Sequence, residues 1–90
     1  MLVERFVSET PGINGGYPVV AGTRTPIRTL VEFVRQGADE IELARLLPHL
    51  THEAIHGALD YYARCPARVD EDIERNARAW AELQSRPWPG

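Results

Sequence analysis

The sequence predicts a mainly α-helical fold, in which a short N-terminal β-hairpin precedes a tri-helical, helix-turn-helix-like bundle and a C-terminal helix. Three observations predict it. β-Branched and aromatic residues gather in the first 20 positions, around an Asn-Gly-Gly turn signal. Farther along, apolar residues recur at helical spacing instead. Residues that favour helix N-termini, at Thr25, Asp39 and Thr51, divide this helical part into separate segments.

Two short strands are expected at the N-terminus, over residues 3–8 and 17–20. The turn that joins them falls on Asn14-Gly15-Gly16. Pro18 would confine the second strand to a sheet edge or a strand start, because proline cannot donate to a strand ladder. Two strands alone are marginal in water, so we expect the hairpin to pack on helices or on another copy of the chain.

The first helix is expected to begin with Thr25 as its N-cap and Pro26 at its first helical position, where a missing N–H is tolerated. Gly37 fits the position just beyond the end of that helix. Asp39, with Glu42 three residues later, resembles a capping box and therefore predicts the start of a second helix.

A short helix over residues 40–47, a tight connection over 48–51 and a longer helix over 52–64, capped by Thr51, follow in the order of a helix-turn-helix. The second helix of such a unit can enter the major groove of DNA. The same arrangement also serves as a tri-helical core without any role in nucleic-acid binding. Both interpretations stay open at this point.

A fourth helix is expected to begin near Asp70, beyond Pro66, and to run to about residue 85. Its apolar side chains form a thin stripe, which suits a partner's groove better than a core. Trp88, in a tail without helical character, adds a second aromatic anchor. Folding back of this helix onto the third one is an equally open alternative. The candidate partner-binding residues are Ile73, Ala77, Trp80, Leu83 and Trp88.

Candidate DNA contacts fall into two segments. Gly22-Thr23-Arg24 leads into the first helix, whose N-terminal N–H groups attract anions. The third helix begins with His52 and Glu53, whereas recognition helices usually offer Arg, Lys, Asn or Gln. Arg24 could equally be a structural clamp, and the histidines could be plain surface residues. The candidate DNA-binding residues are Thr23, Arg24, Arg28, Thr51, His52 and His56.

Length and charge limit the possible function classes. Ninety residues make one domain with a modest core, and such domains often gain stability by oligomerising or by binding a partner. The net charge is −3, whereas DNA-binding domains usually carry a net positive charge. We therefore expect a homodimer or higher oligomer, in which two cationic N-terminal faces combine. The chain divides into a domain over residues 1–65 and a partner-binding helix and tail over 66–90.

No catalytic site, metal site or cofactor is predicted. No serine or cysteine nucleophile has a base in a recognisable setting. His52 and His56 lie one helical turn apart, but Glu53 is the sole candidate for a third ligand. Cys65 is the single cysteine, which excludes an intrachain disulfide. Because no signal segment and no apolar run of about 18 residues is present, we expect a cytoplasmic protein without membrane contact.

Two ordered motifs resemble the family known as domain of unknown function 433. The first is Gly-Gly-Tyr-Pro-Val-Val-Ala-Gly-Thr-Arg-Thr-Pro-Ile over residues 15–27, and the second runs from Gly37 through Leu-Pro-His-Leu-Thr over 47–51 to Tyr62. The resemblance covers residues 3–63. It implies a homeodomain-like or winged-helix-like fold with an N-terminal β element.

Members of that family are often similar to antitoxins encoded beside a PIN-like ribonuclease toxin. The resemblance therefore implies the antitoxin of a type II toxin–antitoxin system, which neutralises its cognate PIN-like toxin by direct contact. It also implies repression of the shared operon through binding of operator DNA. Two alternatives stay open: a stand-alone helix-turn-helix transcription regulator, and a protein-interaction module without DNA binding. None of the three is an enzyme.

Overall fold

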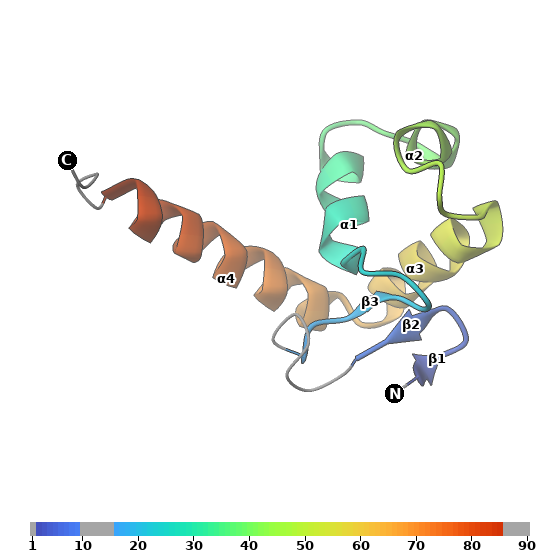
Figure 1. The fold of residues 1–90 in the computed structure, drawn as a ribbon, viewed down its shortest axis with the longest axis horizontal. Coiled ribbons are helices and arrows are strands. Elements are labelled where there is room, and N and C mark those ends of the chain that lie inside the picture. Colours follow the sequence, from blue (N-terminus) through green and yellow to red (C-terminus); the bar gives the residue numbers. More distant parts are fainter. Residues whose placement is uncertain (1, 10–15, 86–90) are drawn as a thin grey trace.

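A small antiparallel sheet lies at one end of a helical bundle, and one helix extends away from both (Figure 1). The computed structural model describes residues 2–9 and 16–85. The strands are β1 (Leu2–Glu4), β2 (Val7–Ser8) and β3 (Val19–Val20), and the helices are α1 (Ile27–Arg35), α2 (Glu40–Leu46), α3 (His52–Arg64) and α4 (Pro66–Ser85). The predicted mainly helical fold class is confirmed.

The sheet has one more strand than the sequence predicts. Residues 3–8 do not form a single strand, because the chain turns at Arg5 and Phe6 and β1 pairs antiparallel with β2. Strand β2 then pairs antiparallel with β3. No glycine or proline marks this turn, so the sequence lacks the usual turn signal there. Asn14 and Gly15 of the predicted loop lie outside the described residues.

The start of α1 differs from the prediction. Pro26 is the N-cap rather than the first helical residue, and no side chain caps this helix. The prediction that Thr25 is the cap is wrong, because its hydroxyl forms a hydrogen bond with Nε2 of His49 instead, at 2.8 Å. The end of α1 is as predicted: Gly37 follows the C-cap with φ of 101°, a conformation that glycine adopts without strain.

The caps of α2 and α3 are confirmed. The Asp39 carboxylate accepts a hydrogen bond from the Glu42 N–H at 2.8 Å. The Thr51 hydroxyl accepts one from the Ala54 N–H at 3.0 Å. These bonds satisfy N–H groups that the first turn of a helix leaves without partners. Local sequence therefore fixes where each of the two helices begins.

Helix α4 begins at Pro66, not near Asp70. Proline ends α3, yet it also suits the first turn of the next helix, where no N–H partner is needed. The earlier start brings Val69 into the hydrophobic core and buries Asp72. The first turns of α4 are therefore part of the bundle.

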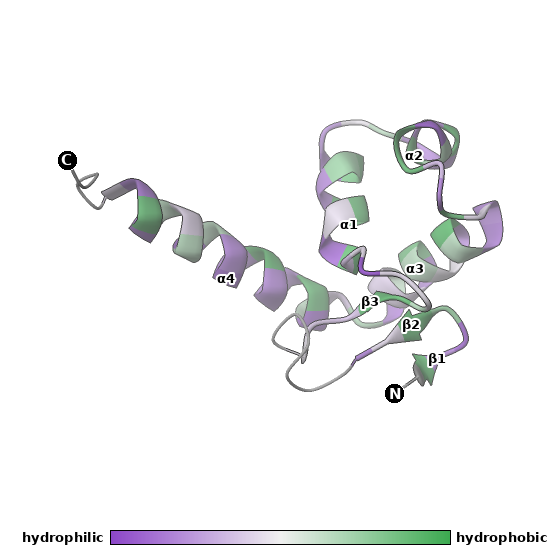
Figure 2. Cartoon of the chain, viewed as in Figure 1, coloured by the Kyte–Doolittle hydropathy of each residue, from purple (hydrophilic) through white to green (hydrophobic). Residues whose placement is uncertain are grey.

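The core lies between the sheet, α1, α2, α3 and the start of α4. Helix α3 is central to it, since it contacts the other three helices together with β2 and β3. The largest fully buried side chains in this core include Ile27, Leu30, Leu43 and Ile55. Beyond Asn76, every described residue of α4 is exposed. This part of the helix projects from the body of the protein (Figure 1), and hydrophobic positions recur along it (Figure 2).

Gly57 allows the turn between β1 and β2 to pack against α3. A Cβ atom at this position would lie 2.4 Å from Cδ2 of Phe6 and 2.9 Å from its Cβ. We expect Gly57→Ala to lower the free energy of unfolding by about 1–2 kcal/mol, because overpacking outweighs the gain of about 0.5–1 kcal/mol that alanine brings to a helix. Urea denaturation measures this change. His56→Ala, on the exposed side, is the control, and a more stable Gly57→Ala protein would contradict the contact.

Candidate functional site

The projecting part of α4 presents apolar side chains to solvent. Trp80 is 59% exposed and Leu83 is 55% exposed, and Ala77 on the same side of the helix is exposed as well. We call these three residues the α4 stripe. Ile73 differs from them, because it is half-buried and packs against the core cluster. Trp88 lies outside the described residues.

Ion pairs hold the base of α4 against α1. Nη1 of Arg28 lies 3.1 Å from Oδ2 of Asp72, whose side chain is 1% exposed. Farther round the helix, Oδ1 of Asp70 accepts hydrogen bonds from Nη2 of Arg35 and from the Tyr62 hydroxyl, each at 2.8 Å. These contacts fix the direction in which the α4 stripe leaves the bundle.

The two predicted DNA-contact segments meet through the hydrogen bond between Thr25 and His49. This bond joins the turn before α1 to the connection before α3. Arg24 is exposed there and makes no hydrogen bond or ion pair with any described residue. Thr51 and His52 are exposed at the start of α3. One hydrogen bond therefore links the turn that contains Arg24 to the connection that leads to Thr51 and His52.

Thr23 and Arg28 are engaged elsewhere. The Thr23 hydroxyl donates to the Val20 carbonyl at 2.8 Å and accepts from the Thr25 N–H at 3.1 Å, so it stabilises the turn before α1. Arg28 is directed at α4 by its ion pair. Thr23 and Arg28 are both half-buried, whereas Arg24 is exposed.

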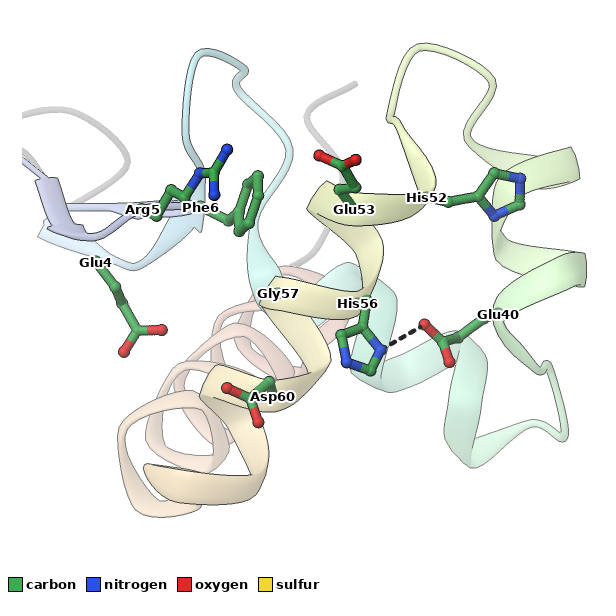
Figure 3. Close-up of a pocket in the computed structure, with 9 residues that line it drawn as sticks. All are labelled: Glu4, Arg5, Phe6, Glu40, His52, Glu53, His56, Gly57 and Asp60. Carbon is green, nitrogen blue, oxygen red and sulfur yellow. Dashed lines mark hydrogen bonds and ion pairs between the residues drawn. The ribbon is translucent and has the colours of Figure 1, made fainter.

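An open groove with a volume of about 810 Å³ runs along α3 (Figure 3). On its wall, Nδ1 of His56 lies 3.1 Å from Oε1 of Glu40, which links α3 to α2. Four carboxylates face this groove against one arginine and two histidines, a balance that repels a phosphate backbone. Sequence reasoning singled out the histidines but missed the acids that other elements supply. The lining residues are Glu4, Arg5, Phe6, Glu40, His52, Glu53, His56, Gly57 and Asp60.

A smaller pocket of about 260 Å³ lies between α1 and α4, and we call it the α1–α4 pocket. Tyr17, Arg28, Arg75, Asn76 and Ala79 line it. The Arg75 guanidinium lies over the Tyr17 ring, 4.7 Å from its centroid. A hydrogen bond with Tyr17 raises the pKa of Arg75 above its ordinary value. No sequence motif signalled this pocket, because its residues come from opposite ends of the chain.

Neither a metal-binding cluster nor a membrane-spanning helix occurs in the described residues. Residues 2–9 and 16–85 contain no group of three or more His, Cys, Asp or Glu side chains placed to hold a metal ion. Within the same ranges, no helix has the length and apolar character required to cross a bilayer.

This chain is similar to known proteins in both sequence and structure. The family described as "Protein of unknown function (DUF433)" matches residues 7–62. The crystal structure of a DUF433 member protein from Anabaena variabilis ATCC 29413, at 2.00 Å resolution, is similar with a TM-score of 0.71 and 37% sequence identity, over 79% of this chain and 70% of that chain. No functionally curated protein matches the sequence. Helix α4 lies beyond the residues that the family matches.

Proposed function

Because the chain belongs to the DUF433 family, we propose that it is the non-enzymatic antitoxin of a type II toxin–antitoxin pair, which neutralises a PIN-like ribonuclease toxin by direct contact. The observation that carries this proposal is the α4 stripe. The resemblance of the two sequence motifs to antitoxin-like family members supplies the partner class. In this proposal, residues 7–62, which match the family, form the scaffold, and α4 contacts the toxin.

The α4 stripe has the properties of a helix that docks in a partner's groove. Trp80 and Leu83 remain mostly exposed, although burying a side chain of this size typically contributes about 1.5–3 kcal/mol. Residues three positions apart on a helix face the same side, so Ala77, Trp80 and Leu83 would enter one groove together. Glu74 and Arg78, both exposed, form an ion pair at 4.0 Å on the polar side of the helix.

The rigid base of α4 favours binding as well. The pair between Arg28 and Asp72 holds the helix to the bundle before any partner arrives. A preformed helix loses less conformational freedom on binding than a segment that must first fold. The α4 stripe is therefore presented in a fixed direction at a low entropic cost.

The experiment that tests the proposal combines capture with inhibition. The full chain is co-expressed with the product of the adjoining gene and purified through a tag on the chain. We expect a PIN-like protein to copurify and its cleavage of RNA to stop at a stoichiometric amount of antitoxin. An adjoining gene of another class, or unchanged RNA cleavage by the mixed proteins, would refute the antitoxin assignment.

Operator DNA is the second candidate ligand. The specific observation in its favour is that the Thr25–His49 hydrogen bond links the turn with exposed Arg24 to the connection before α3. We propose that a homodimer presents two such regions to operator DNA, as half-site recognition by helix-turn-helix proteins requires. Because the acidic groove along α3 already begins at His52 and Glu53, we assign the main phosphate contact to Arg24 rather than to α3.

Arg24→Ala tests this second candidate. We expect weaker binding to the protein's own promoter and a salt dependence reduced by about one unit of slope, because one phosphate contact is lost. Titrations of the promoter fragment at two or more salt concentrations measure both quantities. Arg64→Ala, on the far end of α3, is the control. Equal effects of the two substitutions would remove Arg24 from the DNA contact.

A further inference from the structure

The α1–α4 pocket collects hydrogen-bond donors from three parts of the chain. Arg28 comes from α1, Arg75 and Asn76 from α4, and Tyr17 from the segment before β3. We infer that this pocket binds a single carboxylate group, and that the carboxylate is a side chain of the protein that the α4 stripe captures. The second half of this inference rests on the proposed function.

The donors of the pocket are held in place before a ligand arrives. Nη1 of Arg28 is bonded to Asp72, while its Nε and Nη2 make no hydrogen bond to a described residue. The cation–π contact of Arg75 with the Tyr17 ring restrains the position of the second guanidinium. Planar guanidinium groups bind carboxylates through paired, charge-assisted hydrogen bonds. Two restrained guanidinium groups at one pocket therefore favour this anion.

Size and charge favour a carboxylate over nucleic-acid phosphate. The volume of about 260 Å³ is several times the roughly 30 Å³ of one water molecule, so an Asp or Glu side chain fits. Glu71 and Asp72 lie close enough to Arg75 to interact electrostatically with it. The surroundings are therefore nearly neutral rather than strongly cationic. Such a site accepts one monoanion through directed hydrogen bonds, whereas a phosphate backbone requires accumulated positive charge.

The pocket and the α4 stripe form one continuous surface. Asn76 of the pocket precedes Trp80 by four residues, and Ala79 of the pocket precedes Leu83 by four. Residues at this spacing are neighbours on the surface of a helix. One partner can thus fill the stripe with its groove and the pocket with an acidic side chain. The apolar contact would supply affinity, and the carboxylate would fix the register.

A titration with sodium acetate tests the pocket without any partner. Nitrogen-15 NMR of the full chain follows the side-chain Nε–H signals of Arg28 and Arg75, with sodium chloride at equal ionic strength as the control. We expect saturable shifts of both signals with acetate, at a concentration on the order of 10 mM. Shifts of equal size with chloride would overturn the inference.

Arg75→Gln and Arg78→Gln then test the use of the pocket by the partner. Both remove one charge from α4, but Arg78 does not line the pocket. We expect Arg75→Gln to raise the dissociation constant for the adjoining gene product by at least about tenfold, and Arg78→Gln by less than about twofold. Unchanged melting temperatures check that both variants are folded.

Each remaining outcome has a defined meaning. Equal effects of the two substitutions on partner affinity would overturn the assignment of the carboxylate to the partner. A loss of duplex-DNA affinity in Arg75→Gln, with partner affinity intact, would overturn it as well and assign the pocket to nucleic acid. If the adjoining gene product does not bind at all, the proposed function fails, and the acetate titration still decides whether the pocket is a carboxylate site.

Discussion

Arg28→Ala is expected to lower the free energy of unfolding by about 3–5 kcal/mol, because it leaves the buried carboxylate of Asp72 without its partner cation. Asp72 is 1% exposed, and its Oδ1 already has no hydrogen-bond partner among the described residues. The ion pair with Arg28 therefore carries most of the compensation for this charge. Urea denaturation monitored by circular dichroism measures the loss.

Two further variants keep this prediction testable if Arg28→Ala is too unstable to study. Arg24→Ala removes an exposed arginine nearby and should change stability by less than about 0.5 kcal/mol. The double variant Arg28→Met with Asp72→Leu replaces both charges by apolar groups, so it should be more stable than Arg28→Ala alone. A double variant less stable than Arg28→Ala would show that the unpaired carboxylate is not the source of the loss.

Trp80→Ala is expected to weaken binding of the adjoining gene product by about 2–4 kcal/mol, which corresponds to roughly 30- to 1,000-fold. An exposed tryptophan on a docking helix is the side chain that most often dominates an interface. Its folded environment is mostly solvent, so the free energy of unfolding should change by less than about 0.5 kcal/mol. Isothermal titration calorimetry measures the affinity.

The polar side of α4 provides the control for Trp80→Ala. Arg78 lies on the side of the same helix that faces away from the α4 stripe. Arg78→Ala should therefore change the affinity by less than about twofold. If both substitutions weaken binding equally, the helix contributes through its overall charge or stability. In that case the stripe is not the contact surface.

Much of the fold could be predicted from local signals. Asp39 and Thr51 act as caps, as their sequence context indicates. A cap needs only the backbone N–H three residues later as its partner, so it depends on local sequence. Gly37 ends α1 for a similarly local reason. The turn at Arg5 and Phe6 was missed, since it depends on packing of Phe6 against Gly57 rather than on a turn residue.

The sites were less predictable, because they depend on pairs that are distant in sequence. The start of α1 alone predicts a phosphate contact for Arg28, whereas its ion pair with Asp72 depends on how α4 packs. The exposure of Trp80 also depends on how α4 packs, since a helix that folds back onto α3 would bury this side chain. Periodicity places Ile73, Trp80 and Leu83 on one side of the helix, but it does not indicate that Ile73 packs on the core while the other two are exposed.

Hydrogen–deuterium exchange of the full chain, with and without the adjoining gene product, tests the central claim that the projecting part of α4 is the protein-binding surface. The account predicts that amides over residues 77–85 exchange at least about tenfold more slowly in the complex, because a docked helix opens less often. Unchanged exchange over residues 77–85, in a complex shown intact by gel filtration, would contradict it.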